Sequence, residues 1–297
     1  MDVGNQVFAA GMCCQLFCIA GHSTIIYIIN KAALRDNRFF LIASLSLSDM
    51  IVAIFFIINL IFFRFNEILS GNEMVSVVAY FITMQMMVMF LCLSLQITML
   101  ITIDRYFAVK YSITYQQKVK KEKLKTAIWV MLSFDAITVF VLGLMTNTKQ
   151  YTSLFMSNGR KLFLGTLRII TCIVIINTGI IVIRARNRSE KELKRVPKKL
   201  HGIQAEKLGF YRSIQNSIKD VVVLNFWTVI LLIPLIVNNF LMLFTNGTDF
   251  TTENGVTTTI ASLSNPIIYL LTQRNIRKWV SKNILRRSKV DVCETSF

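Results

Sequence analysis

The stretch LITIDRYFAVKY, residues 100–111, closes a long apolar run with an acid, a base and an aromatic residue. A charged side chain is costly in the hydrocarbon core of a membrane, so ionisable residues within an apolar run mark its boundary or a functional position. Asp104 and Arg105 are adjacent, and each can neutralise the other where water is scarce. The stretch therefore indicates the end of a membrane-spanning helix.

The composition of the whole chain agrees with this interpretation. Of its 297 residues, 54% are hydrophobic and only 16% are charged, whereas about a quarter of a soluble domain is charged. The mean hydropathy is +0.55. The apolar residues also come in long runs, which favours several membrane spans over one large soluble core.

Seven runs are long and apolar enough to cross a bilayer, which takes about 20 residues of helix. We predict helices because strands of a membrane barrel alternate in polarity, and these runs do not. The predicted fold class is therefore an all-α membrane protein. The predicted spans are residues 7–30, 38–63, 74–109, 123–146, 162–183, 214–244 and 252–271.

Basic residues orient these spans. Most of them follow the first, third and fifth spans or lie in the tail, and the basic side of a membrane protein is the cytoplasmic one. We therefore place the N-terminus outside and the C-terminus in the cytoplasm. The net charge of +17 then needs no nucleic acid as a partner. The basic residues that fall on the outer side are Arg64, Lys149, Arg160, Lys161 and Arg168.

The cysteines and the N-terminus exclude some other classes. Five of the six cysteines lie in apolar runs and Cys293 lies near the C-terminus, so we predict no disulfide framework, no zinc site and no cofactor. The first residues contain no Lys or Arg, and the apolar run after them is too long for a cleaved signal peptide.

Polar residues inside the spans are functional candidates because their burial in a bilayer is costly. The three clearest are His22, Asp49 and Asp135. For Asp135, a hydrogen bond between helices is the alternative explanation. Pro234 and Pro266 interrupt the sixth and seventh spans, and a kinked membrane helix can act as a hinge.

These features together resemble the rhodopsin-like (class A) G-protein-coupled receptors over nearly the whole chain. The resemblance implies a seven-transmembrane-helix bundle over residues 1–272, then a C-terminal amphipathic helix and cytoplasmic tail over residues 273–297. It also implies a receptor of the plasma membrane and not an enzyme. The matching motifs are LSLSD with Asp49, DRY with Asp104, Arg105 and Tyr106, Trp129, Pro234, and NPIIY with Asn265, Pro266 and Tyr269.

The resemblance assigns roles to several of these residues. Arg105 is held by Asp104 at rest and meets a heterotrimeric G protein when the sixth helix opens, while Tyr269 moves inward to bridge the open state. The switch residues implied are Asp104, Arg105, Tyr106, Pro234, Asn265, Pro266 and Tyr269. A sodium ion would bind in the middle of the membrane. The polar core implied for it is Asp49, Ser94, Ser262 and Asn265, weakened because His22 and Ala261 replace two usual Asn residues.

The chain also departs from the family pattern. Tyr80 stands where the usual external cysteine of the third helix would be, so the usual external disulfide is not expected. Leu232 replaces the aromatic toggle of the sixth helix, and Ile214 stands where an acid usually pairs with Arg105. Fewer contacts that hold the closed state predict elevated basal activity.

The ligand class can be narrowed by exclusion. Met87 stands where aminergic receptors carry an Asp, and Thr259 stands where opsins carry a Schiff-base lysine. The run MQMMVMF is rich in adaptable methionine, which favours a small, largely apolar extracellular ligand. The alternative is that half of these residues face lipid or neighbouring helices. The pocket candidates are Met84, Met87, Val88, Leu91, Leu232 and Thr259.

The loops and the tail suggest further partners. Asn246 begins a sequon in the last external loop and is a candidate for glycosylation. The run NIRKWVSKNILRR has apolar and basic faces that suit an anionic inner leaflet of membrane lipids. Thr295 and Phe297 fit a PDZ-domain ligand, the alternative being a disordered end. The loop over residues 184–213 is either a solvated linker or a docking surface for a partner.

Two other classes of function remain as alternatives. A transporter or channel would show inverted repeats with broken helices in paired positions. An intramembrane enzyme would show paired acids or a Ser–His couple at one depth. The sequence contains neither pattern in a recognisable form, so the receptor is the preferred hypothesis.

Overall fold

The computed structural model describes residues 3–34, 36–68, 73–110, 120–147, 165–181, 183–184, 187, 222–223, 226–230, 232–234, 236–237 and 250–285. All regular secondary structure in these ranges is helical. The principal elements are α1 (Val3–Lys31), α2 (Asn37–Ile68), α3 (Glu73–Lys110), α5 (Lys121–Asn147), α8 (Phe250–Thr272), α9 (Arg274–Val280) and a short π-helix (Ser281–Leu285). Residues 165–181 form a further helix.

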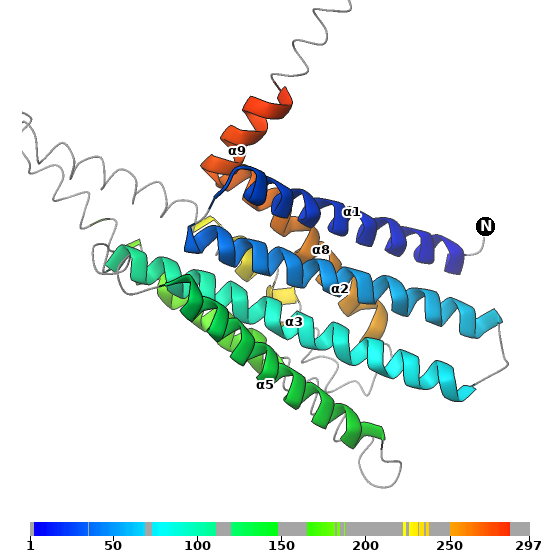
Figure 1. The fold of residues 1–297 in the computed structure, drawn as a ribbon. Helices are drawn as coiled ribbons and strands as arrows, with labels where there is room; N and C mark the ends of the chain where they lie inside the picture. Colours follow the sequence, from blue (N-terminus) through cyan, green and yellow to red (C-terminus); the bar gives the residue numbers. More distant parts are fainter. Residues whose placement is uncertain are drawn as a thin grey trace, which may run out of the picture.

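The long helices lie side by side. Helix α2 packs between α1 and α3, α3 also packs against α5, and α8 packs against α1. Figure 1 shows α1, α2, α3 and α5 running alongside one another, with α8 behind them and α9 turning away at one end of α1. Contacts between helices distant in the sequence, such as α1 and α8, are what bring the polar residues of the spans together.

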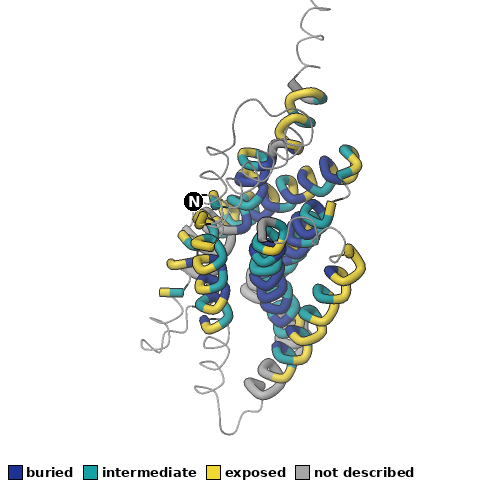
Figure 2. Tube along the Cα trace, turned by 90° about the vertical axis from the view of Figure 1, so that its left-hand side faces the viewer, coloured by how far each residue is buried: buried dark blue, intermediate teal, exposed yellow. Residues whose placement is uncertain are grey.

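The length and apolarity of these helices suit membrane spans. Within the described residues, Phe8–Lys31, Asn37–Phe62, Phe81–Ala108 and Lys121–Val141 are each long and apolar enough to cross a membrane, and Gly165–Ile181 is a shorter apolar helix. Figure 2 shows exposed residues along the outer faces of the helices and buried ones between them. On α5 the exposed side chains include Trp129, Phe134 and Ile137, as expected for a surface solvated by lipid.

The main apolar core lies toward the end of the bundle where α9 begins. Ile25 and Ile28 of α1, Leu45 of α2, Ile97 of α3 and Tyr269 of α8 belong to one buried cluster. Lipid tails are as apolar as these side chains, so moving the side chains out of lipid brings no hydrophobic gain. The cluster is stabilised instead by the close packing of its side chains. The cluster fixes the helices that carry the polar residues described below.

Two small residues of α1 and its end lie at positions with special backbone requirements. A Cβ atom added to Gly21 of α1 would lie 3.2 Å from Cγ of Pro266 in α8, so a glycine lets these two helices approach at this point. Ala33, after the end of α1, has a φ of 50°. The amide of Leu34 donates to the carbonyl of Ile29 at 3.1 Å, which is the six-to-one bond of a Schellman motif, where glycine is usual.

The predicted spans agree with the described helices. The first four correspond to α1, α2, α3 and α5, and the last corresponds to α8. The fifth contains the helix over 165–181, while most of the sixth lies outside the described residues. After the seventh span, α9 buries Ile276 completely, half-buries Trp279 and exposes Lys278. The remainder of the tail, from residue 286, lies outside the described residues.

Candidate functional site

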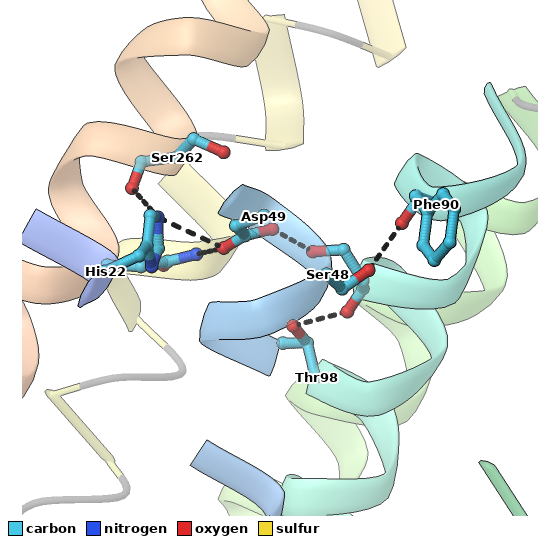
Figure 3. Close-up of polar contacts among 8 residues, drawn as sticks. His22, Ser48, Asp49, Phe90, Thr98 and Ser262 are labelled. Carbon is cyan, nitrogen blue, oxygen red and sulfur yellow. Dashed lines mark hydrogen bonds and ion pairs between the residues drawn. The ribbon is translucent and has the colours of Figure 1, made fainter. Parts of the chain in front are cut away.

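The polar core is built around Asp49 of α2, whose side chain is buried. Ser94 of α3 donates its hydroxyl to Asp49 Oδ1 at 2.5 Å. Asn265 of α8 donates its amide nitrogen to Asp49 Oδ2 at 2.8 Å. Figure 3 shows the carboxylate between these helices. Both carboxylate oxygens therefore accept a hydrogen bond, each from a different helix.

His22 of α1 completes this cluster and is fully buried. Its Nε2 atom lies 3.2 Å from the backbone carbonyl oxygen of Ser262 in α8 and 3.7 Å from Asp49 Oδ2, as Figure 3 shows. A carbonyl oxygen can only accept, so Nε2 is assigned as the nitrogen that carries the proton. The Nδ1 atom has no hydrogen-bond partner within the described part of the chain.

The predicted polar core is thus brought together in space by four helices, α1, α2, α3 and α8. One detail differs from the expectation, because Ser262 contacts His22 through its backbone carbonyl. That carbonyl lies one helical turn before Pro266, whose ring nitrogen has no hydrogen to donate to it. Pro266 therefore leaves free the carbonyl acceptor that His22 uses.

The residues of this core fit a sodium ion poorly. Sodium is a hard cation that takes oxygen ligands, and Asp49, Ser94 and Ser262 could supply them. However, the Nε2 atom of His22, which donates its hydrogen to the Ser262 carbonyl, lies 3.7 Å from Asp49 Oδ2. A nitrogen–hydrogen donor repels a cation whether or not the imidazole is charged. The core is therefore better described as a hydrogen-bonded link between helices than as a cation site.

The backbone around the core is tied by further side chains. Ser48 of α2 donates to the carbonyl oxygen of Phe90 in α3 at 2.8 Å, and Thr98 donates to the carbonyl oxygen of Ser94 at 2.9 Å. Both bonds are drawn in Figure 3. The first bond joins α2 to α3, and the second lies within α3, next to the Ser94 hydroxyl that contacts Asp49.

The charged pair at the end of α3 forms the second candidate region. Arg105 Nη2 lies 2.7 Å from Asp104 Oδ2, and the side chain of Asp104 is 1% exposed while that of Arg105 is 13% exposed. The guanidinium is thus held by its neighbour but keeps part of its surface open. Tyr106 packs its ring against Phe107, with 5.4 Å between ring centroids.

Tyr269 of α8 lies in the apolar core and is fully buried. Its hydroxyl has no hydrogen-bond partner among the described residues. A buried hydroxyl without a partner is unfavourable, so a change that brings it to a partner would lower the free energy.

A comparison with families of known proteins bears on this geometry. The family model of the seven-transmembrane receptors (rhodopsin family) matches residues 23–269. The chain belongs to this family. A search of curated proteins finds no match. The protein is therefore a class A receptor and a multi-pass membrane protein, not an enzyme, and the transporter and intramembrane-enzyme alternatives are set aside.

Asp135 has a structural role in this receptor. Gln96 of α3 donates its amide nitrogen to Asp135 Oδ1 of α5 at 2.7 Å, and both side chains are buried. This is the hydrogen bond between helices that was the alternative explanation for Asp135. The pair links α3 to α5, away from the polar core.

The predicted pocket residues fall into three groups. Met84, Met87 and Leu91 are half-buried on α3. Val88 packs in a buried cluster with Val139 of α5, and Leu232 packs in another with Leu95 and Cys172. Val88 and Leu232 thus face neighbouring helices of the receptor, and for Val88 this is the alternative given for the methionine-rich run. The side chain of Thr259 lies outside the described residues.

The structure describes some of the other predicted positions of the receptor, and the rest lie outside the described residues. Pro234 has helical backbone conformation and is exposed. Trp129 is exposed on α5. The glycosylation candidate, the lock position, the possible PDZ ligand and the tail cysteine lie outside the described residues; they are Asn246, Ile214, Thr295, Phe297 and Cys293.

Arg168 and Gln85 are among the buried polar side chains of the receptor that the sequence does not single out. Arg168 was counted among the outer basic residues, but it is 2% exposed within the helix over 165–181. Gln85 lies in the methionine-rich run of the sequence and is fully buried on α3. The signal that could have found them is the same as for Asp49: a strongly polar residue within an apolar run.

Proposed function

We propose that the protein is a receptor that binds a small extracellular ligand and activates heterotrimeric G proteins through Arg105. The observation that carries the proposal is the pair at the end of α3, where Arg105 Nη2 lies 2.7 Å from Asp104 Oδ2 and keeps part of its surface exposed. A guanidinium has five N–H donors, so it can exchange its carboxylate neighbour for the carbonyl oxygens of a partner helix.

The polar core supplies a route from ligand to G protein. Asp49 joins α2 to α3 through Ser94 and to α8 through Asn265. A ligand that moves the outer end of one of these helices alters the shared carboxylate contacts, and thereby biases the inner ends. Tyr269, four residues after Asn265, then moves to a new hydrogen-bond partner in the open state. Such a ligand acts only as far as it prefers the open state over the closed one.

The proposal includes an orientation. The N-terminus and the loop that contains Asn246 face outside, while Arg105, α9 and the tail face the cytoplasm. The basic residues near the inner ends support this orientation. Treatment of cell-surface receptor with a glycosidase tests it, because only an external Asn246 can carry a glycan; Asn246→Gln is the control that should abolish any shift in mobility.

The division of the chain follows from this orientation. Residues 1–272 make up the transmembrane receptor, and residues 273–297 make up a surface helix and a cytoplasmic tail. Buried Ile276 with exposed Lys278 supports a helix that lies on anionic lipid. A PDZ-domain protein is a further proposed partner for Thr295 and Phe297, and loss of its binding to the tail on Phe297→Asp tests it.

Nucleotide exchange on co-expressed G proteins tests the function itself. We expect exchange above the cell background, rising in proportion to the number of receptors at the surface. A panel of G-protein subtypes is needed because the sequence does not define the subtype. If exchange stays at background for every subtype although the receptor reaches the surface, the proposal is wrong.

A further inference from the structure

The hydrogen bond between α3 and α5 leaves one oxygen atom of each side chain unsatisfied. Gln96 Nε2 donates to Asp135 Oδ1 at 2.7 Å. The two remaining oxygens, Asp135 Oδ2 and Gln96 Oε1, are buried and have no hydrogen-bond partner within the described part of the chain. Buried polar atoms are nearly always paired in native proteins. The pair therefore lacks a hydrogen that would complete it.

Both unsatisfied atoms are acceptors. A carboxylate oxygen and an amide oxygen carry lone pairs and no hydrogen, so neither can bond to the other. One proton added to Asp135 Oδ2 satisfies both atoms, because the acid hydroxyl can then donate to Gln96 Oε1. A carboxylic acid and a carboxamide match in this way, since each offers one donor and one acceptor side by side. The observed bond is one half of such a pair.

The burial of Asp135 favours the neutral acid. Its side chain is fully buried on α5, although the neighbouring Phe134 and Ile137 are exposed. The charged form of a carboxyl group is disfavoured where water is excluded, and the cost is greatest inside a membrane. A proton on the carboxyl group removes this cost.

Few charged groups lie near enough to oppose this effect. Cys92 of α3 lies within electrostatic range of Asp135, and Arg168 of the helix over 165–181 lies within range of Cys92. Arg168 would favour a carboxylate, but Asp135 Oδ2 accepts no hydrogen bond from it. On α2, which also packs against α5, Asp49 bonds to α3 and α8. The charged residues over 121–125 of α5 precede Asp135 by ten residues or more, which is about 15 Å of helix.

We propose that Asp135 binds a proton from solution, shares it with Gln96, and thereby holds α5 against α3. The proton adds to Oδ2, the charge of the side chain changes from −1 to zero, and two hydrogen bonds replace one. Loss of the proton leaves a buried carboxylate with a single bond, so the α3–α5 contact weakens as the pH rises. Helix α3 also carries Ser94 and Arg105, so the proton acts on the helix that the proposed coupling uses.

Infrared spectroscopy of purified receptor in detergent tests the proposal, because a protonated carboxyl group has a carbonyl band that a carboxylate lacks. The difference spectrum between wild type and Asp135→Asn should contain this band at neutral pH. Gln96→Met removes the N–H group that bonds to the carbonyl, so the band should remain and move to higher frequency. Glu122→Gln replaces an exposed acid of the same helix and is the matched control that should leave the band unchanged.

Thermal unfolding at several pH values gives a second measurement. Asp135→Asn keeps the shape and offers a permanent N–H donor to Gln96 Oε1, so it mimics the protonated acid. An aspartate in the unfolded chain loses its proton at about pH 4, and stability falls with rising pH while only the folded chain keeps the proton. The unfolding temperature of wild type should therefore fall relative to that of Asp135→Asn between about pH 5 and pH 7, by a few degrees or on that order.

The outcomes decide the proposal without a G protein. A spectrum in which Asp135→Asn removes no carbonyl band would mean that water or another donor completes the pair, and would overturn the proton site. A constant difference in unfolding temperature between pH 5 and pH 7 would also do so. If Asp135→Asn does not fold, Gln96→Met decides, and an unshifted band overturns the proposal. A receptor with the band but without nucleotide exchange would refute the proposed coupling and leave the proton site standing.

Discussion

The Nε2 atom of His22 lies 3.7 Å from Asp49 Oδ2 and 3.2 Å from the carbonyl oxygen of Ser262, and thus joins α1 to both α2 and α8. Its ring therefore lies next to the carboxylate oxygen that also accepts from Asn265. An Asn at this position, usual in the family that the chain resembles, is smaller and offers a carbonyl oxygen in addition to its donors. We therefore expect the identity of this one residue to influence whether the core can hold sodium.

We predict that sodium has little effect on this receptor near neutral pH and that His22→Asn makes it sensitive. The variant removes the ring and supplies an oxygen, so sodium can then bind and favour the closed state. The measurement is basal or ligand-driven nucleotide exchange in sodium and in an equimolar impermeant organic cation. Equal sodium sensitivity of wild type and variant would contradict the prediction.

Arg105→Ala should abolish G-protein activation while surface expression stays close to wild type. The side chain makes its described hydrogen bond to the adjacent Asp104, so its removal leaves the packing between helices intact. Nucleotide exchange normalised to surface receptor is the readout. As a control, Lys125→Ala removes an exposed charge that pairs with Glu122 on α5, and should leave exchange unchanged. Wild-type exchange in Arg105→Ala would count strongly against the proposed coupling.

Basal activity should be elevated, and Ile214→Glu should lower it. In this family an acid of the sixth helix usually pairs with the arginine at the position of Arg105. The wild-type chain lacks this acid, so we expect fewer contacts in the closed state. A new contact worth about 1.4 kcal/mol would reduce a small open population about tenfold. Ligand-free exchange is measured against receptor number, and Ile214→Gln, similar in size without the charge, is the control. Basal exchange that does not increase with receptor number would argue against the idea.

Ala33→Gly should stabilise the receptor by about 1 kcal/mol. Ala33 has a φ of 50° after the end of α1, and the left-handed conformation costs a residue with a Cβ atom about 1–2 kcal/mol, part of which glycine loses again in chain entropy. We expect a higher unfolding temperature in detergent. Ala32→Gly, next to it, is the control and should lower the unfolding temperature. A decrease for Ala33→Gly would contradict the Schellman assignment.

Gly21→Ala should destabilise the receptor more than Gly11→Ala. An added Cβ at Gly21 would lie 3.2 and 3.3 Å from atoms of the rigid Pro266 ring, whereas one at Gly11 would lie 3.3 Å from the end of the flexible Leu60 side chain. Overpacking costs about 1–3 kcal/mol where neighbours cannot adjust. The unfolding temperatures of the two variants are compared, and equal values would show that the α1–α8 contact adjusts more readily than proposed.

The sequence by itself determined the membrane class, the helical state and the approximate limits of most described spans. These follow from local properties, because each helix satisfies its own backbone hydrogen bonds and each apolar run is long enough for a bilayer. Asp104 and Arg105 could also be paired from the sequence, since they are adjacent. The motifs around Asp49 and Asn265 predicted that the two residues share a polar core, and the 2.8 Å contact now joins them.

Only the tertiary structure decided which polar residues meet. Asp49 and Asp135 look alike in the sequence. Asp49 contacts residues of three other helices, whereas the hydrogen bond described for Asp135 is the one with Gln96. Arg168 looks like an outer basic residue and is buried on an inward face. Which face of a helix turns inward depends on the neighbouring helices. Each span has apolar residues on all of its faces. The helical period therefore gives no direction until the helices pack.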